Sequence, residues 1–205
     1  MQLVSPIDPF VSRPVRIVNG EGSLGTLLGG RPPIGVAPAG ETGHLRYFAT
    51  VPLTEEPMQL VSIFLADLES LMAVRGRVNP NGLLELVVHA PVQRGSGSSA
   101  LDSGLSAHGL SVLASASDLV IDDDGTQVIR PGHKVGGRPH LLRASSQLSR
   151  ALDDLWNAGH LLVSQFDFPS GDDAVVSGDW PFADGIFALF GRPPFDQDWR
   201  WYWDF

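Results

Sequence analysis

The sequence predicts an α+β fold built mostly from antiparallel sheet, with at least one helix over residues 145–158. Three observations favour this class: short alternating apolar segments recur along the 205 residues, one segment has helical spacing, and the phrase Gly-Gly-Arg-Pro occurs twice. Short strands separated by Gly- and Pro-rich turns favour antiparallel pairing. The length suits a single domain covering residues 1–205.

The strands are expected where apolar residues alternate or cluster between turn residues. They fall at 14–18, 44–53, 59–68, 83–90, 160–168 and 184–191, and at the C-terminus, where Trp199, Trp201 and Trp203 share one face. A helix is the alternative for 59–68. Residues 117–129 are typical of a hairpin in which Asp124-Gly125 forms a type I′ turn. The Asp run at 122–124 lacks the spacing of a calcium loop.

The helix at 145–158 has the clearest signals in the chain. Ser145 or Ser146 can cap its start, and Gly159 suits the position just after its end. Its apolar side recurs at helical spacing through Leu148, Leu152, Leu155 and Trp156.

The two Gly-Gly-Arg-Pro phrases predict a diverged internal duplication. Each phrase precedes a strand that opens on His and then an apolar strand containing Ile-Phe. Repeat one covers about 14–92, a Gly/Ser-rich connector covers 93–104, and repeat two covers about 117–205. Paired glycines allow positive φ and proline ends a helix, so the phrase favours a tight structural reversal. Its structural residues are Gly29, Gly30, Pro32, His133, Gly136, Gly137, Pro139 and Gln165.

The charge of the chain is uneven. The net charge is −9, and residues 151–205 hold ten Asp against Arg192 and Arg200. Such a segment repels nucleic acid and membrane phosphate and attracts basic partners. The alternative is a solvated face that aids solubility. The chain has no cysteine, no apolar run of membrane-spanning length and no signal-peptide pattern. We therefore expect a cytoplasmic protein without membrane or nucleic-acid contacts.

Cofactor and metal sites are not expected. The formal Gly-x-Gly-x-x-Gly at 20–25 is followed by Gly and Pro residues that exclude the helix a dinucleotide site requires. The six histidines lack close metal-ligand spacing. The carboxylates at 167–184 could serve as acid and base, or simply form an acidic loop.

Three segments in the second half resemble the bacterial YwqG-like family. They are "HKVGGRP" at 133–139, "LLVSQFDF" at 161–168 and "GDWPFADGIFALFG" at 178–191. The resemblance covers about 130–191, including the Gln165-x-Asp167 pair. The tract before the last segment is shorter than in the family, and much of 70–130 has no counterpart. The resemblance implies a duplicated α+β fold without established catalytic residues. Some members of the family lie beside secreted toxins and resemble immunity proteins.

These observations predict an immunity protein that is not an enzyme. It would occlude a basic cognate toxin, such as a nuclease effector delivered by type VI secretion, and its Asp-rich loops would speed association. The expected contact residues are Asp167, Asp172, Asp173, Asp179, Trp180, Asp184, Asp196, Asp198 and Trp201. The alternative is an enzyme or small-ligand-binding protein that uses the Gly-Gly-x-Pro loop with Gln165 and Asp167. An exposed aromatic C-terminal strand would also allow a homodimer.

Overall fold

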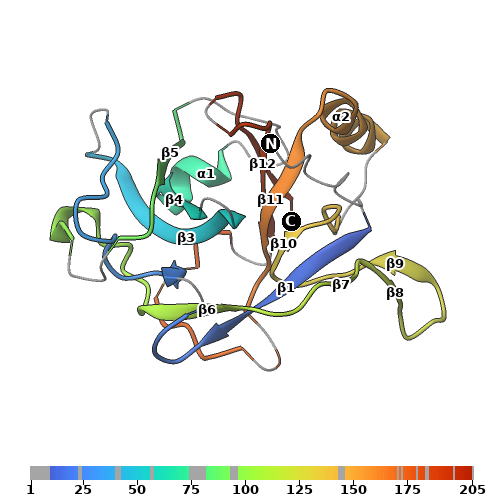
Figure 1. The fold of residues 1–205 in the computed structure, drawn as a ribbon, viewed down its shortest axis with the longest axis horizontal. Coiled ribbons are helices and arrows are strands. Elements are labelled where there is room, and N and C mark those ends of the chain that lie inside the picture. The colour runs from blue at the N-terminus through green and yellow to red at the C-terminus, as the bar shows by residue number, and fades with distance from the viewer. Residues whose placement is uncertain are drawn as a thin grey trace.

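The structure of the chain is a computed structural model. It describes residues 10–22, 25–39, 43–55, 58–73, 82–92, 97–142, 146–169, 171, 173–178, 180–182, 185–195 and 197–204. Most of the strands in these residues form one large antiparallel sheet (Figure 1). A separate hairpin and two short α-helices are attached to it.

The elements occur along the chain in the following order. In the first half they are β1 (Val11–Val18), β2 (Leu27–Leu28), β3 (Leu45–Glu55), β4 (Met58–Ala66), α1 (Leu68–Met72), β5 (Leu84–His89) and the 3-10 turn η2 (Ser99–Leu101). In the second half they are β6 (His108–Val112), β7 (Ala116–Ser117), β8 (Leu119–Ile121), β9 (Gln127–Ile129), β10 (Lys134–Gly136), α2 (Ser146–Asn157), β11 (Leu161–Phe166), β12 (Ile186–Gly191) and β13 (Arg200–Asp204).

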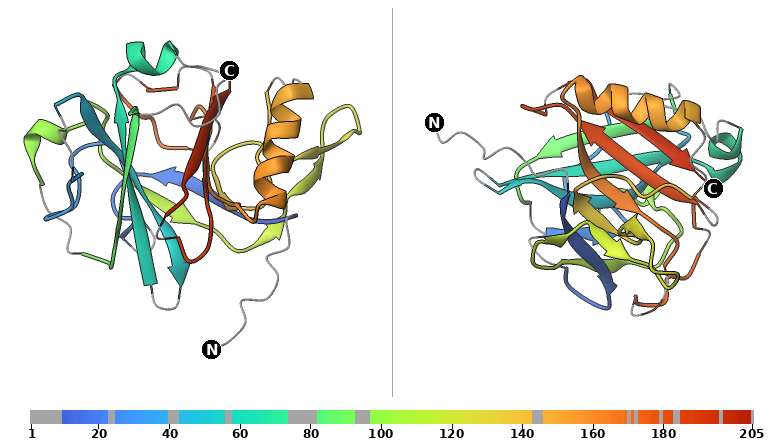
Figure 2. Two further views of the ribbon diagram at one scale, coloured as in Figure 1. Left: turned by 90° about the horizontal axis from the view of Figure 1, so that it is seen from above. Right: turned by 90° about the vertical axis from the view of Figure 1, so that its right-hand side faces the viewer.

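The large sheet has eleven strands and is centred on β1 and β6. Its order is β13-β12-β11-β10-β1-β6-β2-β3-β4-β5, with β7 beside β1. The first residues of β1 pair with β10, and its later residues pair with β6. Strands β10–β13 therefore form one arm and β2–β5 form the other. The sheet curls so that the two arms face each other, as in half of a barrel (Figure 2).

An aromatic core fills the space between the two arms. The ring of Phe48 on β3 lies 4.9 Å from that of Phe166 on β11 and 5.0 Å from that of Phe182. Phe182 in turn stacks on Phe187 of β12 at 4.7 Å. Edge-to-face and stacked ring pairs stabilise a core beyond their buried area. The closure of the half-barrel thus depends on contacts between residues more than 100 positions apart.

Helix α2 covers the outer surface of the arm formed by β10–β13, hereafter the second arm. Leu148 and Leu152 pack there against Leu162, Phe190 and Tyr202. Strand β12 is consequently buried on both faces. The helix ends as its sequence predicts: Gly159 has φ of 84°, and the His160 N–H donates to the carbonyl of Leu155 at 3.0 Å.

The prediction of a mostly antiparallel sheet with at least one helix is confirmed. The expected strands at 14–18, 44–53, 83–90, 160–168 and 184–191 are present with shifts of a few residues. Segment 59–68 is a strand up to Ala66, after which α1 begins. Strands β2, β6, β7 and β10 were not predicted. Among the helices of the described residues, none combines the length and the apolar composition of a membrane-spanning segment.

The turn type predicted for the 117–129 hairpin is wrong. Gly125 has φ of 79°, but Asp124 is not in the positive-φ region that a type I′ turn requires. The Gly125 N–H instead donates to the Asp122 carbonyl at 3.0 Å. The Asp122 carboxylate also accepts the N–H groups of Asp124 and Thr126 at 3.1 and 2.8 Å. This side-chain cap stabilises a longer turn with a single left-handed residue.

Candidate functional site

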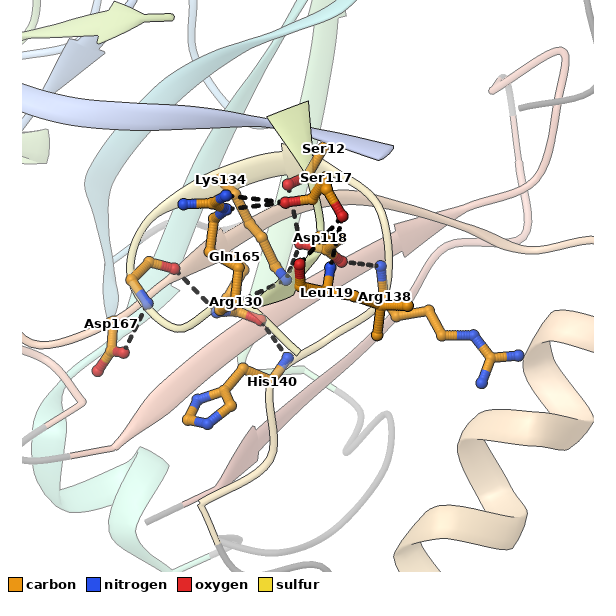
Figure 3. Close-up of polar contacts among 11 residues, drawn as sticks. Ser12, Ser117, Asp118, Leu119, Arg130, Lys134, Arg138, His140, Gln165 and Asp167 are labelled. Carbon is orange, nitrogen blue, oxygen red and sulfur yellow. Dashed lines mark hydrogen bonds and ion pairs between the residues drawn. The ribbon is translucent and has the colours of Figure 1, made fainter. Parts of the chain in front are cut away.

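The loop carrying the second Gly-Gly-Arg-Pro phrase is built around Asp118, which lies just before β8 (Figure 3). One carboxylate oxygen of Asp118 accepts from the Ser12 hydroxyl at 2.8 Å and from the Lys134 ammonium at 2.7 Å. The other accepts from the backbone N–H of Arg138 at 2.7 Å. A single buried carboxylate therefore joins β1, β10 and the loop after β10.

Gln165 and Asp167 hold the same loop from β11. The Gln165 amide donates to the Gly132 carbonyl at 2.8 Å and accepts from the His140 N–H at 2.7 Å. Asp167 accepts from the Gly132 N–H at 3.1 Å. These residues satisfy backbone groups that the loop would otherwise leave unpaired. The Gln-x-Asp pair of the sequence motif thus has a structural role.

His133 extends this network to the first strand. Its Nδ1 accepts from the Asp167 N–H at 3.1 Å, and its Nε2 lies 3.3 Å from the Asp173 carboxylate. Asp173 also accepts from the Ile17 N–H of β1 at 2.9 Å. The side chains of His133 and Asp173 are 2% and 12% exposed, so Asp173 faces inward and not toward a partner.

The paired glycines of both phrases have the conformation that the sequence predicts. Gly29 and Gly30 have φ of 68° and 66°, and Gly136 and Gly137 have φ of 74° and 76°. At Gly137 a Cβ atom would clash with the Asp118 carboxylate. The second glycine of the pair is thus required by both its φ and the close passage of Asp118. Pro32 is buried and Pro139 is half-buried beside these turns.

The pKa of Lys134 departs strongly from its ordinary value. Its side chain is completely buried, and desolvation of the ammonium lowers the pKa to about 8. The hydrogen bond and the charge of Asp118 oppose this decrease without cancelling it. The cavity of about 10 Å³ that Lys134 lines is too small for a substrate, so the cation serves as a structural element of the sheet.

The described residues of the predicted contact set are largely engaged inside the molecule. Trp180 and Trp201 are 8% and 3% exposed and belong to the aromatic core. Trp180, predicted as a partner contact, is packed inside the molecule: its ring lies 5.6 Å from Phe48 and 6.2 Å from His133. Trp201, Tyr202 and Trp203 are also buried, so β13 does not present the exposed aromatic surface expected for a homodimer.

Asp198 forms a polar cluster with Arg192, Arg200 and His160. Its carboxylate lies 2.6 Å from Arg200, 3.2 Å from His160 and 3.8 Å from Arg192. This cluster connects the loop before β13 with the start of β11. The other contact residues expected from the sequence lie outside the described residues: Asp172, Asp179, Asp184 and Asp196.

The described residues contain no group of three His, Cys, Asp or Glu side chains that could hold a metal ion. His44 contacts the Gly82 carbonyl at 3.2 Å, and His160 contacts the Asp198 carbonyl at 3.0 Å. Leu27–Leu28, which follow the formal Gly-x-Gly-x-x-Gly, form β2. The helix that a dinucleotide site needs does not start there.

A concave feature lies between α2, β9 and the loop after β10. It is a cavity of about 470 Å³ whose lining includes Arg138, Leu141, Leu152, Trp156 and Phe190. Two pairs of exposed carboxylates, Asp153-Asp154 and Asp123-Asp124, lie on the helix and hairpin that border it. Sequence reasoning assigned these residues to a helix and a turn and did not bring them together.

Asp118 was also missed as a residue of the network. It stands four residues before the 122–124 acidic run, within the segment 117–129 that was predicted only as a hairpin. The available signal was its place between Ser117 and the apolar Leu119-Val120, where a carboxylate needs a buried partner.

No protein-family model matches the chain, and no curated protein and no solved structure match it either.

Proposed function

We propose that this chain is a binding protein and not an enzyme, and specifically an immunity protein that occludes a basic cognate toxin such as a nuclease. The observation that carries the proposal is the placement of Asp153-Asp154 and Asp123-Asp124 on neighbouring elements, α2 and the β8–β9 hairpin. Val128 and Ile129 of the hairpin line the same cavity as Leu152 of the helix, so the two elements are adjacent.

These four carboxylates are not neutralised internally. Within the described residues none of them has an ion-pair partner, whereas Asp118, Asp173 and Asp198 do. Uncompensated charge on one surface raises the association rate with a partner of opposite charge. A toxin that acts on nucleic acid must itself be basic. The proposed contact surface therefore includes α2 and the hairpin, and not Asp167, Asp173 or Asp198.

The residues around the second Gly-Gly-Arg-Pro phrase support a protein that is not an enzyme. Its charged and amide groups on Asp118, Lys134 and Gln165 are all buried and hydrogen-bonded to the sheet or the loop. Such groups stabilise a conformation and offer no open position to a reacting molecule. The resemblance to YwqG-like proteins, some of which resemble immunity proteins, is consistent with this role.

The test is recovery of a partner from the cells that make the protein, followed by measurement with the purified partner. Calorimetry at low and high salt should give a stoichiometric complex that weakens as salt increases. Asp154→Lys should weaken binding at least tenfold at low salt. Glu69→Lys, on the exposed part of α1, changes the net charge equally and is the matched control. Equal effects of the two substitutions would refute the proposed surface.

An inhibition measurement tests the immunity role itself. One equivalent of the protein should abolish the toxic or nuclease activity of the partner, and Asp154→Lys should raise the required concentration. A partner that is bound without loss of its activity would contradict the occlusion mechanism, even if the surface were correct.

We also propose that the two arms of the sheet are diverged copies. In one arm, β2 is followed by Gly29-Gly30 and later by the paired strands β3 and β4. In the other arm, β10 ends on Gly136, Gly137 follows, and the paired strands β11 and β12 come later in the chain. The strand order places the two arms symmetrically about β1 and β6. Alignment of the two halves across relatives should give matching positions over these strands. The absence of any match would oppose duplication.

A further inference from the structure

The cavity beside α2 has the size and lining of a small-molecule site. Its volume is about 470 Å³, within the range of roughly 300–1,000 Å³ that such sites occupy. Leu141, Leu152, Trp156 and Phe190 supply apolar walls. Arg138 adds a cationic group to this lining.

The guanidinium of Arg138 is held between two aromatic rings. Its Cζ atom lies 5.3 Å from the centroid of Phe10 and 5.7 Å from that of Trp156. Figure 3 shows the side chain leaving the Asp118 network and extending toward α2. Ring contacts of this kind stabilise the cation and orient its plane.

The N–H groups of this guanidinium have no acceptor in the described residues. Only the backbone N–H of Arg138 is engaged, with Asp118. Arg31 occupies the corresponding position in the first Gly-Gly-Arg-Pro phrase, but its guanidinium lies 3.6 Å from the Asp102 carboxylate. Thus one arginine of the two phrases is paired with a carboxylate, and the other lines a cavity and has no carboxylate partner in the described residues.

We infer that this cavity binds a small organic monocarboxylate with a flat apolar body. Arg138 would donate two parallel hydrogen bonds to the carboxylate, a geometry that its planar fork favours. The apolar body would lie against Trp156 and Leu152. Asp153 also lines the cavity and is exposed, so its negative charge disfavours ligands with several negative charges. This inference does not rest on the proposed toxin-binding role.

The test uses benzoate, 3-phenylpropionate and indole-3-acetate, each beside its neutral amide. Binding to the full chain is measured by calorimetry and by ¹⁵N NMR, in which the indole N–H of Trp156 reports on the cavity. Arg138→Gln removes the guanidinium and keeps the backbone N–H that bonds Asp118. Arg31→Gln is the matched control in the other phrase, and the NMR spectrum verifies the fold of both variants.

At least one carboxylate should bind saturably and shift the Trp156 signal. Its amide should bind at least tenfold more weakly, Arg138→Gln should lose at least tenfold, and Arg31→Gln should bind like the wild type. The inference is overturned if none of the three carboxylates binds, or if the amides bind as well as the acids. It is also overturned if Arg138→Gln binds normally. The comparison of acid and amide on the wild-type chain remains decisive if Arg138→Gln does not fold.

Discussion

The ammonium of Lys134 lies 2.7 Å from the carboxylate of Asp118, and both side chains are fully buried. Lys134 also donates to the Arg130 carbonyl at 3.0 Å. The carboxylate has further donors in Ser12 and Arg138. A buried ion pair is tolerated when its remaining hydrogen-bonding capacity is satisfied in this way. The pair links the first strand of the sheet to the loop of the second glycine phrase.

Removal of the carboxylate should destabilise the protein strongly. Asp118→Ala leaves the Lys134 cation buried without its partner and breaks the bond to Arg138, so we expect a loss of about 3–5 kcal/mol in the free energy of unfolding. Asp123→Ala, in the exposed turn nearby, should change it by less than about 0.5 kcal/mol. Urea unfolding followed by circular dichroism measures both. A loss below about 1 kcal/mol for Asp118→Ala would contradict a structural role.

The lowered pKa of Lys134 predicts a pH dependence of stability. The pKa is about 8 in the folded chain and 10.5 as the ordinary value for an unfolded one. Between these values the unfolded chain binds a proton that the folded chain has released. The contribution of Lys134 to the free energy of unfolding should therefore increase with pH across this window and be lost as the pH falls through 8.

This dependence is measured against a variant that cannot titrate at this position. Urea unfolding of the wild type and of Lys134→Met between pH 7.5 and 10 isolates the contribution of Lys134 as the difference between the two proteins. The difference should move in favour of the wild type as the pH rises. A constant difference would show that Lys134 keeps its proton throughout the range.

Alanine substitutions at two glycines with the same φ distinguish the cost of backbone strain from the cost of a steric clash. Gly137 and Gly35 both have φ of 76°, but a Cβ at Gly137 meets Asp118 and Ser12, whereas one at Gly35 meets nothing within 4 Å. Gly35→Ala should cost about 1–2 kcal/mol for the left-handed conformation. Gly137→Ala should cost at least about 2 kcal/mol more, because the clash displaces the Asp118 carboxylate. Equal losses would show that Asp118 can move without cost.

The strands that could be predicted are those whose own residues carry the pattern. Segments 44–53 and 160–168 alternate or are continuously apolar, and they form strands of 11 and 6 residues. Strands β2 and β7 have two residues each and β10 has three. Their pairing depends on distant partners, as when Ser12 pairs with Gly136. A local pattern contains no information about such pairing.

The same limit applies to the candidate site. The structural role of the Gly-Gly-Arg-Pro phrase followed from glycine and proline chemistry alone. The partner that fixes its second copy, Asp118, is 16 residues from Lys134, and Gln165 bonds His140 across 25 positions. Arg138 and Trp156 meet only because α2 folds back over the second arm. The hydrophobic periodicity predicted the helix but not which loop it covers.

Because Trp180 lies in the core, we expect its substitution to act on the stability of the protein and not primarily on binding. The indole is 8% exposed and its ring centroid lies 5.6 Å from that of Phe48 and 6.1 Å from that of Phe182. Trp180→Ala removes a large ring from a core whose neighbours come from both arms of the sheet, and it should cost about 3–5 kcal/mol. Phe168 is 48% exposed. Phe168→Ala should therefore change the free energy of unfolding by less than about 0.5 kcal/mol. Guanidinium unfolding monitored by far-UV circular dichroism compares the two variants. If Trp180→Ala kept wild-type stability, the ring would not be part of the core, and its assignment as a partner contact would become the better explanation.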